Sequence, residues 1–202
     1  MKTMVKLGPS DHGRAMSYDE YLSGDYRGGY HYELIDGKLY VTPLPNLPEN
    51  RVELWLLYKL LRYADDHPDI INYVTPKSRV FVHARPKVTT PEPDLAAYHN
   101  FPTELPLDQV RWQEVSPVLV AEVLTSDDPE KDMVRNVELF WQVPTIKEYW
   151  IFDIRDDPNH PLMQVYRRGR KKWQITDLDV GDTFITKLLP EFKLVLDPRR
   201  RG

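Results

Sequence analysis

The chain has 202 residues, with 27 Lys and Arg against 31 Asp and Glu, so its formal charge is −4. Hydrophobic residues make up 41% of it and cysteine is absent, which favours a packed core and excludes disulfide scaffolds, thiolate zinc sites and cysteine nucleophiles. The acidic balance argues against broad binding to nucleic acid, because phosphate contacts need clustered Lys and Arg. No apolar run has the length of a signal peptide or a membrane span, which predicts a soluble, cytoplasmic protein without a membrane partner.

The N-terminal third is expected to contain one capped helix, one hairpin and one long helix. Residues 1–16 are polar and are expected to be flexible. Ser17, with a glutamate three residues later, has the pattern of a capping box, which predicts a short helix. Asp36 and Gly37 separate two β-rich runs in YHYELIDGKLYVTP and so predict a hairpin. Residues 49–66 carry apolar side chains at helical spacing on a face so wide that this helix should be central.

The middle of the chain predicts strands around a parallel crossover. Short strands are expected at residues 71–74, 78–84 and 93–99, followed by a polar loop over residues 100–116. VLVAEVL, at residues 118–124, is a continuous apolar run of the kind found in strands that are covered on both faces. A second such run, EYWIFDI, occupies residues 148–154. A strand, a helix and a strand in this order predict a right-handed crossover with parallel strands.

The helix between these two runs is expected to begin with Asp128 as N-cap and Pro129 at its first position. Its buried stripe is predicted to consist of Met133, Val137, Phe140 and Trp141. Further on, LMQVYRRGRKKWQITDL predicts a hairpin that turns near Gly169. One more strand or helical turn should precede the basic tail of residues 197–202.

Two carboxylates stand in sequence contexts that disfavour a charge. Glu122 lies near the middle of the apolar run 118–124, and Asp94 follows Pro93 at the start of another apolar segment. A buried carboxylate is costly unless it is paired, hydrogen-bonded or bound to a metal. On neighbouring strands the two could converge, and converging carboxylates are what Mg²⁺ requires. The plain alternative stays open, in which Glu122 is a core acid bonded to a Tyr or Arg and Asp94 is a turn residue.

Four segments in this order resemble one known family: YELIDGKLYV, PEPDLAAY, PVLVAEVLTSDDPEKD and KEYWIFD. Together they resemble the Uma-two family of bacterial putative restriction endonucleases, in the PD-(D/E)XK nuclease superfamily, over residues 17–196. The resemblance implies one α/β domain with a restriction-endonuclease-like fold, in which helices flank a mixed β-sheet. It implies a metal-dependent DNA endonuclease that hydrolyses phosphodiester bonds with Mg²⁺ or Mn²⁺, and it is compatible with a homodimer.

The resemblance also assigns residues to the site. Pro93 and Asp94 match the "PD" of the motif, and Glu122 matches its "(D/E)", so that Asp94 and Glu122 are implied metal ligands that also position the attacking water. Glu33 matches a third acid that completes the metal site. Asp132 matches an acidic residue on the helix that follows the glutamate strand.

The lysine of the superfamily is missing from its expected positions. Leu124 stands two positions after the motif glutamate, and Asn136 stands where Uma-two proteins commonly carry a displaced lysine, about four residues before an aromatic. Arg135 can stabilise a phosphate but is a poor base because it stays protonated. We expect Arg135 and Asn136 to act in place of the lysine, and Lys131 or Lys77 could substitute spatially. The plain alternative is that Arg135 forms an ion pair within its own helix.

The missing lysine leaves a second interpretation open, a catalytically degenerate nuclease fold that binds DNA or another protein without cutting. One dense basic cluster could contact a nucleic-acid backbone in either case. It spans the predicted C-terminal hairpin turn and consists of Arg167, Arg168, Arg170, Lys171 and Lys172. A solvated turn is the simpler explanation of this cluster, because loops collect charge.

Overall fold

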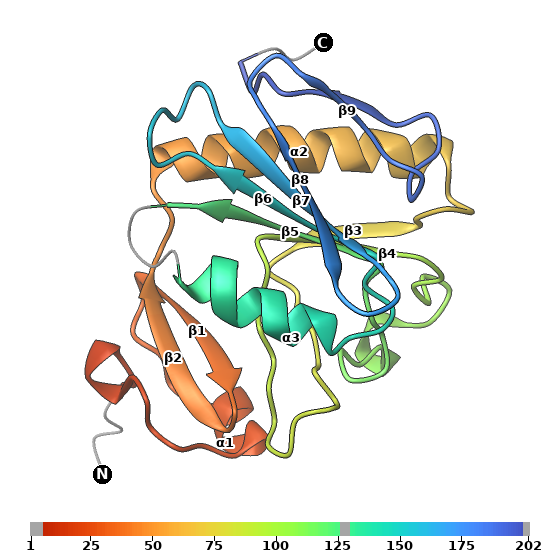
Figure 1. Cartoon of the computed structure of the whole chain (residues 1–202). Coiled ribbons are helices and arrows are strands. Elements are labelled where there is room, and N and C mark those ends of the chain that lie inside the picture. The colour runs from red at the N-terminus through yellow and green to blue at the C-terminus, as the bar shows by residue number, and fades with distance from the viewer. Residues whose placement is uncertain (1–5, 126–129, 200–202) are drawn as a thin grey trace, which may run out of the picture.

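A six-stranded mixed β-sheet forms the centre of the computed structural model, which describes residues 6–125 and 130–199 (Figure 1). Its strands are β3 (Tyr73–Pro76), β4 (Leu95–Tyr98), β5 (Leu119–Leu124), β6 (Glu148–Asp153), β7 (Leu162–Arg168) and β8 (Trp173–Leu178), and they neighbour one another in this order. β5 and β6 pair in parallel, as predicted for two buried runs that flank a helix. The other neighbouring strands of this sheet pair antiparallel.

Helices cover both faces of this sheet. One face carries α2 (Leu47–Asp66), and the other carries α3 (Val137–Trp141), which continues from the π-helix η3 (Lys131–Asn136) (Figure 1). Alternate residues of β5 belong to the two cores: Ala121 and Val123 lie in the core that includes α2, whereas Val120 and Leu124 lie in the core that includes α3. The prediction of a strand covered on both faces is therefore confirmed.

A separate hairpin of β1 (Tyr30–Ile35) and β2 (Lys38–Pro43) lies beside the sheet (Figure 1). Its predicted turn is confirmed: Asp36 and Gly37 have φ angles of 50° and 67°, and a two-residue type I′ turn requires a positive φ at both positions. The predicted capping box is also present at the start of α1 (Tyr18–Ser23). There, the Ser17 hydroxyl accepts from the Glu20 N–H, and the Glu20 carboxylate accepts from the Ser17 N–H.

The remaining short elements are η1 (Pro9–Asp11), η2 (Leu107–Gln109), β9 (Thr183–Ile185) and β10 (Lys193–Val195), and the last two form a hairpin. Within the N-terminal segment that was expected to be flexible, residues 12–16 lie along β2, with Ala15 opposite Lys38. Gly13 N–H donates to Leu39 O, and Leu39 N–H donates to Arg14 O, because the edge of the hairpin offers backbone groups that need partners. No helix in the described part of the chain is long and apolar enough to cross a bilayer.

Two predicted strands differ from the structure. The strand expected at residues 78–84 does not form. In this stretch, Val80 N–H donates a hydrogen bond to Pro91 O, and Val82 N–H donates one to Thr89 O. Pro91 has no N–H with which to return a second bond, so a regular ladder cannot develop there. The strand expected at residues 71–74 is shifted along the chain and forms β3.

The helical segment between β5 and β6 also differs from its predicted amphipathic pattern. Its first part, η3, is a π-helix, whose wider i→i+5 turns shift the buried side away from the α-helical stripe. Met133 was expected to be buried but is 36% exposed, whereas Asp132 and Asn136 are buried. The predicted N-cap Asp128 and the following Pro129 lie outside the described residues.

Candidate active site

A cleft of about 290 Å³ lies between the β1–β2 hairpin and the end of β5 that carries Glu122. Its lining includes six carboxylates and two lysines: Glu33, Glu49, Glu92, Asp94, Glu122, Asp132, Lys77 and Lys131. The three acids that the resemblance assigns to the metal site, Glu33, Asp94 and Glu122, all line this cleft. Acids packed this closely repel one another, so the cleft requires cations or protons to compensate them.

Asp94 and Glu122 form the centre of the cleft. They belong to neighbouring antiparallel chain segments, and the backbone of each segment binds the side chain of the other. Asp94 N–H donates to Glu122 Oε2 at 3.0 Å, and Val123 N–H donates to Asp94 Oδ2 at 2.7 Å. Both residues are buried, with 6% and 1% exposed. Backbone N–H groups of Asp94 and of β5 therefore help to hold both carboxylates in position.

Two glutamates of α2 add carboxylates to this centre. Ligand atoms of Glu49, Glu53 and Asp94 all lie within 4.8 Å of one another. Burial and the nearby Asp94 charge raise the pKa of Glu49 and of Glu53 to about 7. Neither glutamate was predicted as a site residue; the signal that could have indicated them is two glutamates four residues apart near the start of a largely buried helix.

Lys77 reaches the same carboxylates from the segment that follows β3. Its backbone has a φ of 51°, in the left-handed region. Its ammonium contacts Asp94 Oδ1 and lies 3.2 Å from Glu53 Oε1. Burial alone would raise the pKa of Asp94, but Lys77 and Lys131 bring it below the ordinary value. Asp94 is thus held ionised by positive charges in the cleft.

Glu33 lies on β1, and both of its oxygens are bonded. Oε2 accepts from Arg135 Nη2 at 2.8 Å, and Oε1 accepts from Glu92 N–H at 2.9 Å. Although burial opposes ionisation, Lys131 and Arg135 lower the pKa of Glu33 to about 2. The Arg135 guanidinium also lies 5.1 Å from the ring centre of Tyr40. Glu33 and Arg135 therefore fasten the hairpin to η3, and Glu33 is not among the three acids around Asp94 whose ligand atoms lie within 4.8 Å of one another.

Asn136 bridges two carboxylates with its amide group. Its Nδ2 donates to Glu122 Oε1 at 2.9 Å and to Asp132 Oδ1 at 3.0 Å, and its carbonyl accepts from Arg135 Nε. Burial and neighbouring carboxylates raise the pKa of Glu122 well above its ordinary value and that of Asp132 to about 7. Asn136 thus orients Glu122 and Asp132 without supplying a charge.

Lys131 brings a second ammonium group to the cleft. Its Nζ lies 3.8 Å from Asp132 Oδ1 and 4.0 Å from Glu33 Oε2. Burial alone would lower the pKa of Lys131, but Glu33, Glu122 and Asp132 raise it above the ordinary value. This ammonium group therefore stays protonated at neutral pH.

The basic cluster at the β7–β8 turn divides into two parts. Arg168 donates to the carbonyls of Phe140, Trp141, Val143 and Ile146, and its guanidinium lies between the rings of Trp141 and Trp173. Arg167 donates to Glu148 Oε1 at 3.0 Å and to Ile185 O at 3.2 Å. These two arginines hold the C-terminal end of α3 and the β9 region in place. Arg170, Lys171 and Lys172 are exposed, and contact of the cluster with DNA stays a prediction.

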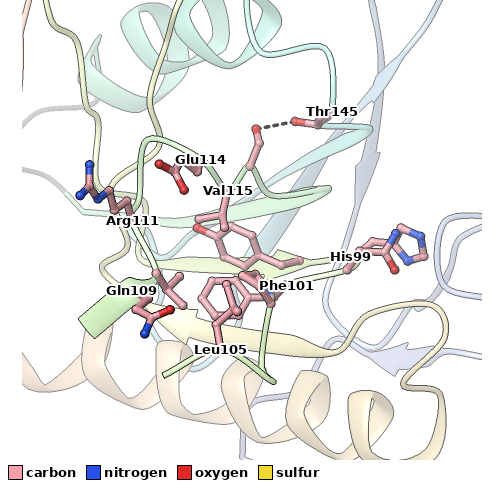
Figure 2. A pocket seen from close by; sticks show the side chains of 13 residues that line it. His99, Phe101, Leu105, Gln109, Arg111, Glu114, Val115 and Thr145 are labelled. Atoms are coloured by element: carbon pink, nitrogen blue, oxygen red, sulfur yellow. Dashed lines mark hydrogen bonds between the residues drawn. The ribbon is translucent and has the colours of Figure 1, made fainter. Parts of the chain in front are cut away.

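A larger pocket of about 490 Å³ lies at the opposite end of β4 and β5 (Figure 2). Phe101 and Leu105 contribute apolar surface, and Ser116 is hydrogen-bonded to Thr145 across it at 2.6 Å. Glu114 is the single acid among its lining residues. This pocket cannot assemble several carboxylates around one ion, so the smaller acidic cleft is the candidate active site.

Comparisons with known proteins agree with this architecture. The family model of Uma2, described as putative restriction endonuclease, matches residues 18–197. A crystal structure of a putative nuclease belonging to DUF820 from Anabaena variabilis has a TM-score of 0.63 and 15% sequence identity, and the match covers 90% of this chain and 95% of that chain. No curated protein matches the chain. The likeness to the solved nuclease confirms the predicted restriction-endonuclease-like fold.

Proposed function

This chain belongs to the Uma2 family of putative restriction endonucleases, and we propose that it is a divalent-cation-dependent DNA endonuclease that hydrolyses phosphodiester bonds. The observation that carries this proposal is the Asp94–Glu122 pair, which the backbones of two neighbouring chain segments fix in a cleft lined by further acids. Buried, converging carboxylates with shifted pKa values are typical of catalytic sites.

The donor set of the cleft fits a hard divalent ion. Oxygen ligands from carboxylates are what Mg²⁺ and Mn²⁺ prefer. The Asp94 N–H is bonded to Glu122, and a carboxylate oxygen of Asp94 lies within 4.8 Å of oxygens of Glu49 and Glu53. We propose that Asp94 and Glu122 hold the ion, with a carboxylate of α2 as a third ligand. Glu33 as the third ligand stays a prediction, because both of its oxygens are bonded to other groups.

The surrounding side chains have separate tasks in this proposal. A bound divalent ion supplies a water of lowered pKa and neutralises charge on the phosphate. Asn136 donates to both Glu122 and Asp132 and so fixes the orientation of these carboxylates relative to each other. Asp132, with a pKa of about 7, can accept a proton at neutral pH. Arg135 acts as a positioning residue, because it donates to both Glu33 and Asn136.

A second candidate function is a nuclease fold that binds DNA or another protein without cutting. One observation favours it: the Lys77 ammonium contacts Asp94 and Glu53, where a metal ion would need the same oxygens. An internal cation can balance these acids without a metal. This alternative predicts no binding of divalent ions, together with salt-sensitive binding to duplex DNA.

The experiment that separates the two candidates measures nicking of supercoiled plasmid and, by calorimetry, binding of Mg²⁺ and Mn²⁺. The wild-type protein is compared with Asp94→Asn and Glu122→Gln, which keep the size of each side chain. The exposed Asp65→Asn is the matched control. We expect ion binding and ion-dependent nicking in the wild type and the control, and a loss of nicking of at least ~10³-fold in the two site variants.

Two results would contradict this proposal. Nicking at the wild-type rate in both site variants would place the chemistry elsewhere or in a contaminant. A wild-type protein that binds duplex DNA but neither ion would support the non-cutting alternative.

A further inference from the structure

We propose that the outer edge of β8 is the surface through which two copies of this chain associate, with their β8 strands antiparallel about a two-fold axis. Among the residues that the structure describes, β8 pairs with β7 on one side and with no strand on the other (Figure 1). An unpaired strand edge is a template for pairing with another chain. This inference concerns assembly and does not depend on the proposed nuclease activity.

The backbone of β8 presents every second residue to the open edge. Arg168 N–H donates to Lys147 O, so this residue of β7 directs its backbone groups toward β6, and Trp173 of β8 lies opposite it. In an antiparallel ladder, pairs that exchange hydrogen bonds alternate with pairs that do not. The N–H and C=O groups of Trp173, Ile175 and Asp177 therefore point away from β7, where a second strand can bind them.

The middle of β8 lacks the features that usually protect an edge strand. Gln174, Ile175 and Thr176 are uncharged, and the strand contains neither proline nor glycine. Its six residues pair with β7 in an unbroken register, without a bulge. By contrast β3, the strand at the other edge of the sheet, has four residues and ends in Pro76. Charges, prolines and bulges are the usual protection, so β8 is the edge that is open to a partner.

β8 also extends beyond the helices that cover the two faces of the sheet. All residues of the segment 174–177 are exposed, although successive residues of a strand point to opposite faces. Ile175 is 55% exposed, whereas Tyr166, opposite it on β7, is buried. A second β8 strand would place its own Ile175 against this one, and such cross-strand apolar pairs stabilise a sheet.

The charges at the two ends of β8 favour a second copy as the partner. Lys171 and Lys172 precede the strand, Asp177 and Asp179 lie at its other end, and all of them are exposed. Lys171 and Asp179 are equally far from Ile175 along the chain, so a two-fold axis at Ile175 brings the lysine of one copy opposite the aspartate of the other. Both ends of the interface then join opposite charges, whereas parallel strands would join like charges. A two-fold dimer requires this kind of self-complementary surface.

The test reverses each charged end separately. Lys171→Glu/Lys172→Glu makes both ends of the edge acidic, and Asp177→Lys/Asp179→Lys makes both ends basic. Sedimentation velocity from about 1 to about 200 µM protein gives the dimer dissociation constant of each protein alone and of an equimolar mixture of the two variants. The control, Leu54→Ser, changes an exposed leucine of α2. The urea midpoint verifies that each protein folds, and no DNA is present.

We expect the wild type to dimerise within this range and each reversed variant to raise the dissociation constant by at least about 10²-fold. The mixture should form heterodimers with a constant within about tenfold of the wild type, because every contact again joins opposite charges. Leu54→Ser should dimerise like the wild type.

Two further measurements test the strand edge itself. Ile175→Pro removes an N–H that faces the edge and not β7, so it should dissociate the dimer, whereas Ile175→Val keeps this N–H and should not. Hydrogen exchange of the Ile175 N–H in the wild type should slow as the protein concentration rises, because the partner strand accepts from it. A dimer formed through another surface would not slow this exchange.

Three outcomes overturn the inference. One is a wild-type protein that stays monomeric up to about 200 µM. Another is a mixture of folded reversed variants that stays monomeric. The third is dissociation by Leu54→Ser while the β8 variants still dimerise, which would place the contact on α2. If a reversed variant does not fold, hydrogen exchange decides, and a wild-type dimer with an unprotected Ile175 N–H counts against the inference.

Discussion

At one end of the central sheet six carboxylates line a cleft of about 290 Å³, whereas at the other end a pocket of about 490 Å³ contains a single acid. The second end also carries the basic β7–β8 turn, which sequence analysis had proposed for binding DNA. The hollows at the two ends therefore differ in volume, and the charged side chains at the two ends differ in sign and in burial.

On the proposed assignment of the active site to the acidic cleft, the burial and partners of charged groups indicate function better than the volume of a hollow or the density of charge in the sequence. At the acidic end, Asp94 and Glu122 are buried beside other acids, which is costly unless hydrogen bonds, cations or protons compensate them. At the basic end, Arg167 and Arg168 are hydrogen-bonded to backbone carbonyls and to Glu148, which is a structural use. Substitutions at the two ends test this contrast.

The largest expected effect concerns Arg168, at the basic end. Arg168→Ala should lower the free energy of unfolding by about 4 kcal/mol, because it removes the hydrogen bonds to the carbonyls at the end of α3 and the contacts with two tryptophan rings. Urea denaturation followed by circular dichroism measures this change. The exposed Arg170→Ala is the control and should stay within about 0.5 kcal/mol of the wild type. Equal effects of the two variants would remove the structural role given to Arg168.

Glu33→Gln separates an anchor from a metal ligand. We expect it to lower the free energy of unfolding by about 3 kcal/mol at pH 7, because Arg135 and Lys131 lose a buried negative charge. The pKa of Glu33 is lowered to about 2 from an ordinary value of 4.5, so its contribution is complete above about pH 4.5 and disappears as the pH falls toward 2.

The measurement is the urea midpoint of both proteins between pH 7 and pH 2, with the difference expected to shrink over the acid half of this range. Calorimetry with Mg²⁺ completes the test. A strong loss of Mg²⁺ affinity with an unchanged free energy of unfolding would identify Glu33 as a metal ligand, as the sequence resemblance implies.

Glu53→Gln tests the contribution of α2 to the acidic end. The change should weaken Mg²⁺ binding by about 10²-fold, since one carboxylate near Asp94 is lost. The pKa of Glu53 is raised to about 7, so protons compete with the ion below neutral pH, and the wild-type affinity should increase from pH 6 to pH 8. Calorimetric titrations at these two values measure both effects. An affinity equal to that of the wild type would remove α2 from the proposed ion site.

The exposed part of the basic cluster should have a smaller effect. Replacing Arg170, Lys171 and Lys172 by glutamine should weaken duplex binding about fivefold and make its salt dependence less steep, because fewer phosphates are neutralised. Cleavage at saturating DNA should not change. Fluorescence anisotropy at several salt concentrations gives both values, and unaltered binding would favour the solvated turn over a DNA contact.

The smallest effect is expected in the larger pocket. Leu105 is 47% exposed, so Leu105→Ser should change the free energy of unfolding by less than about 0.5 kcal/mol. Plasmid nicking should stay within about twofold of the wild-type rate, because this pocket lies at the far end of β4 and β5 from the acids. A clear loss of nicking would show that the two ends of the sheet are coupled.

Local patterns were enough to predict several elements of the structure. The Asp36-Gly37 turn, the capping box at Ser17 and the apolar strand around Glu122 depend on residues close together in the chain, and all three are present. The sequence left open whether Asp94 and Glu122 converge on neighbouring strands, and the structure brings them together, with Asp94 N–H donating to Glu122 Oε2.

Other features were decided only by tertiary packing. The π-helix, which buries Asp132 and Asn136 and exposes Met133, is a local departure that α-helical spacing cannot indicate. Glu53 and Lys77 join Asp94 because α2 and the segment after β3 converge on one end of the sheet.

The sequence by itself determined which acids would be too costly to bury alone, because the apolar residues on either side of each acid are its neighbours along the chain. The tertiary structure decided which cations and amides those acids meet: Lys77 beside Asp94, Asn136 beside Glu122 and Arg135 beside Glu33. The physical reason is range: burial preference is a property of each residue and its neighbours in sequence, whereas a charge interaction depends on distances of a few ångströms between residues far apart in the chain.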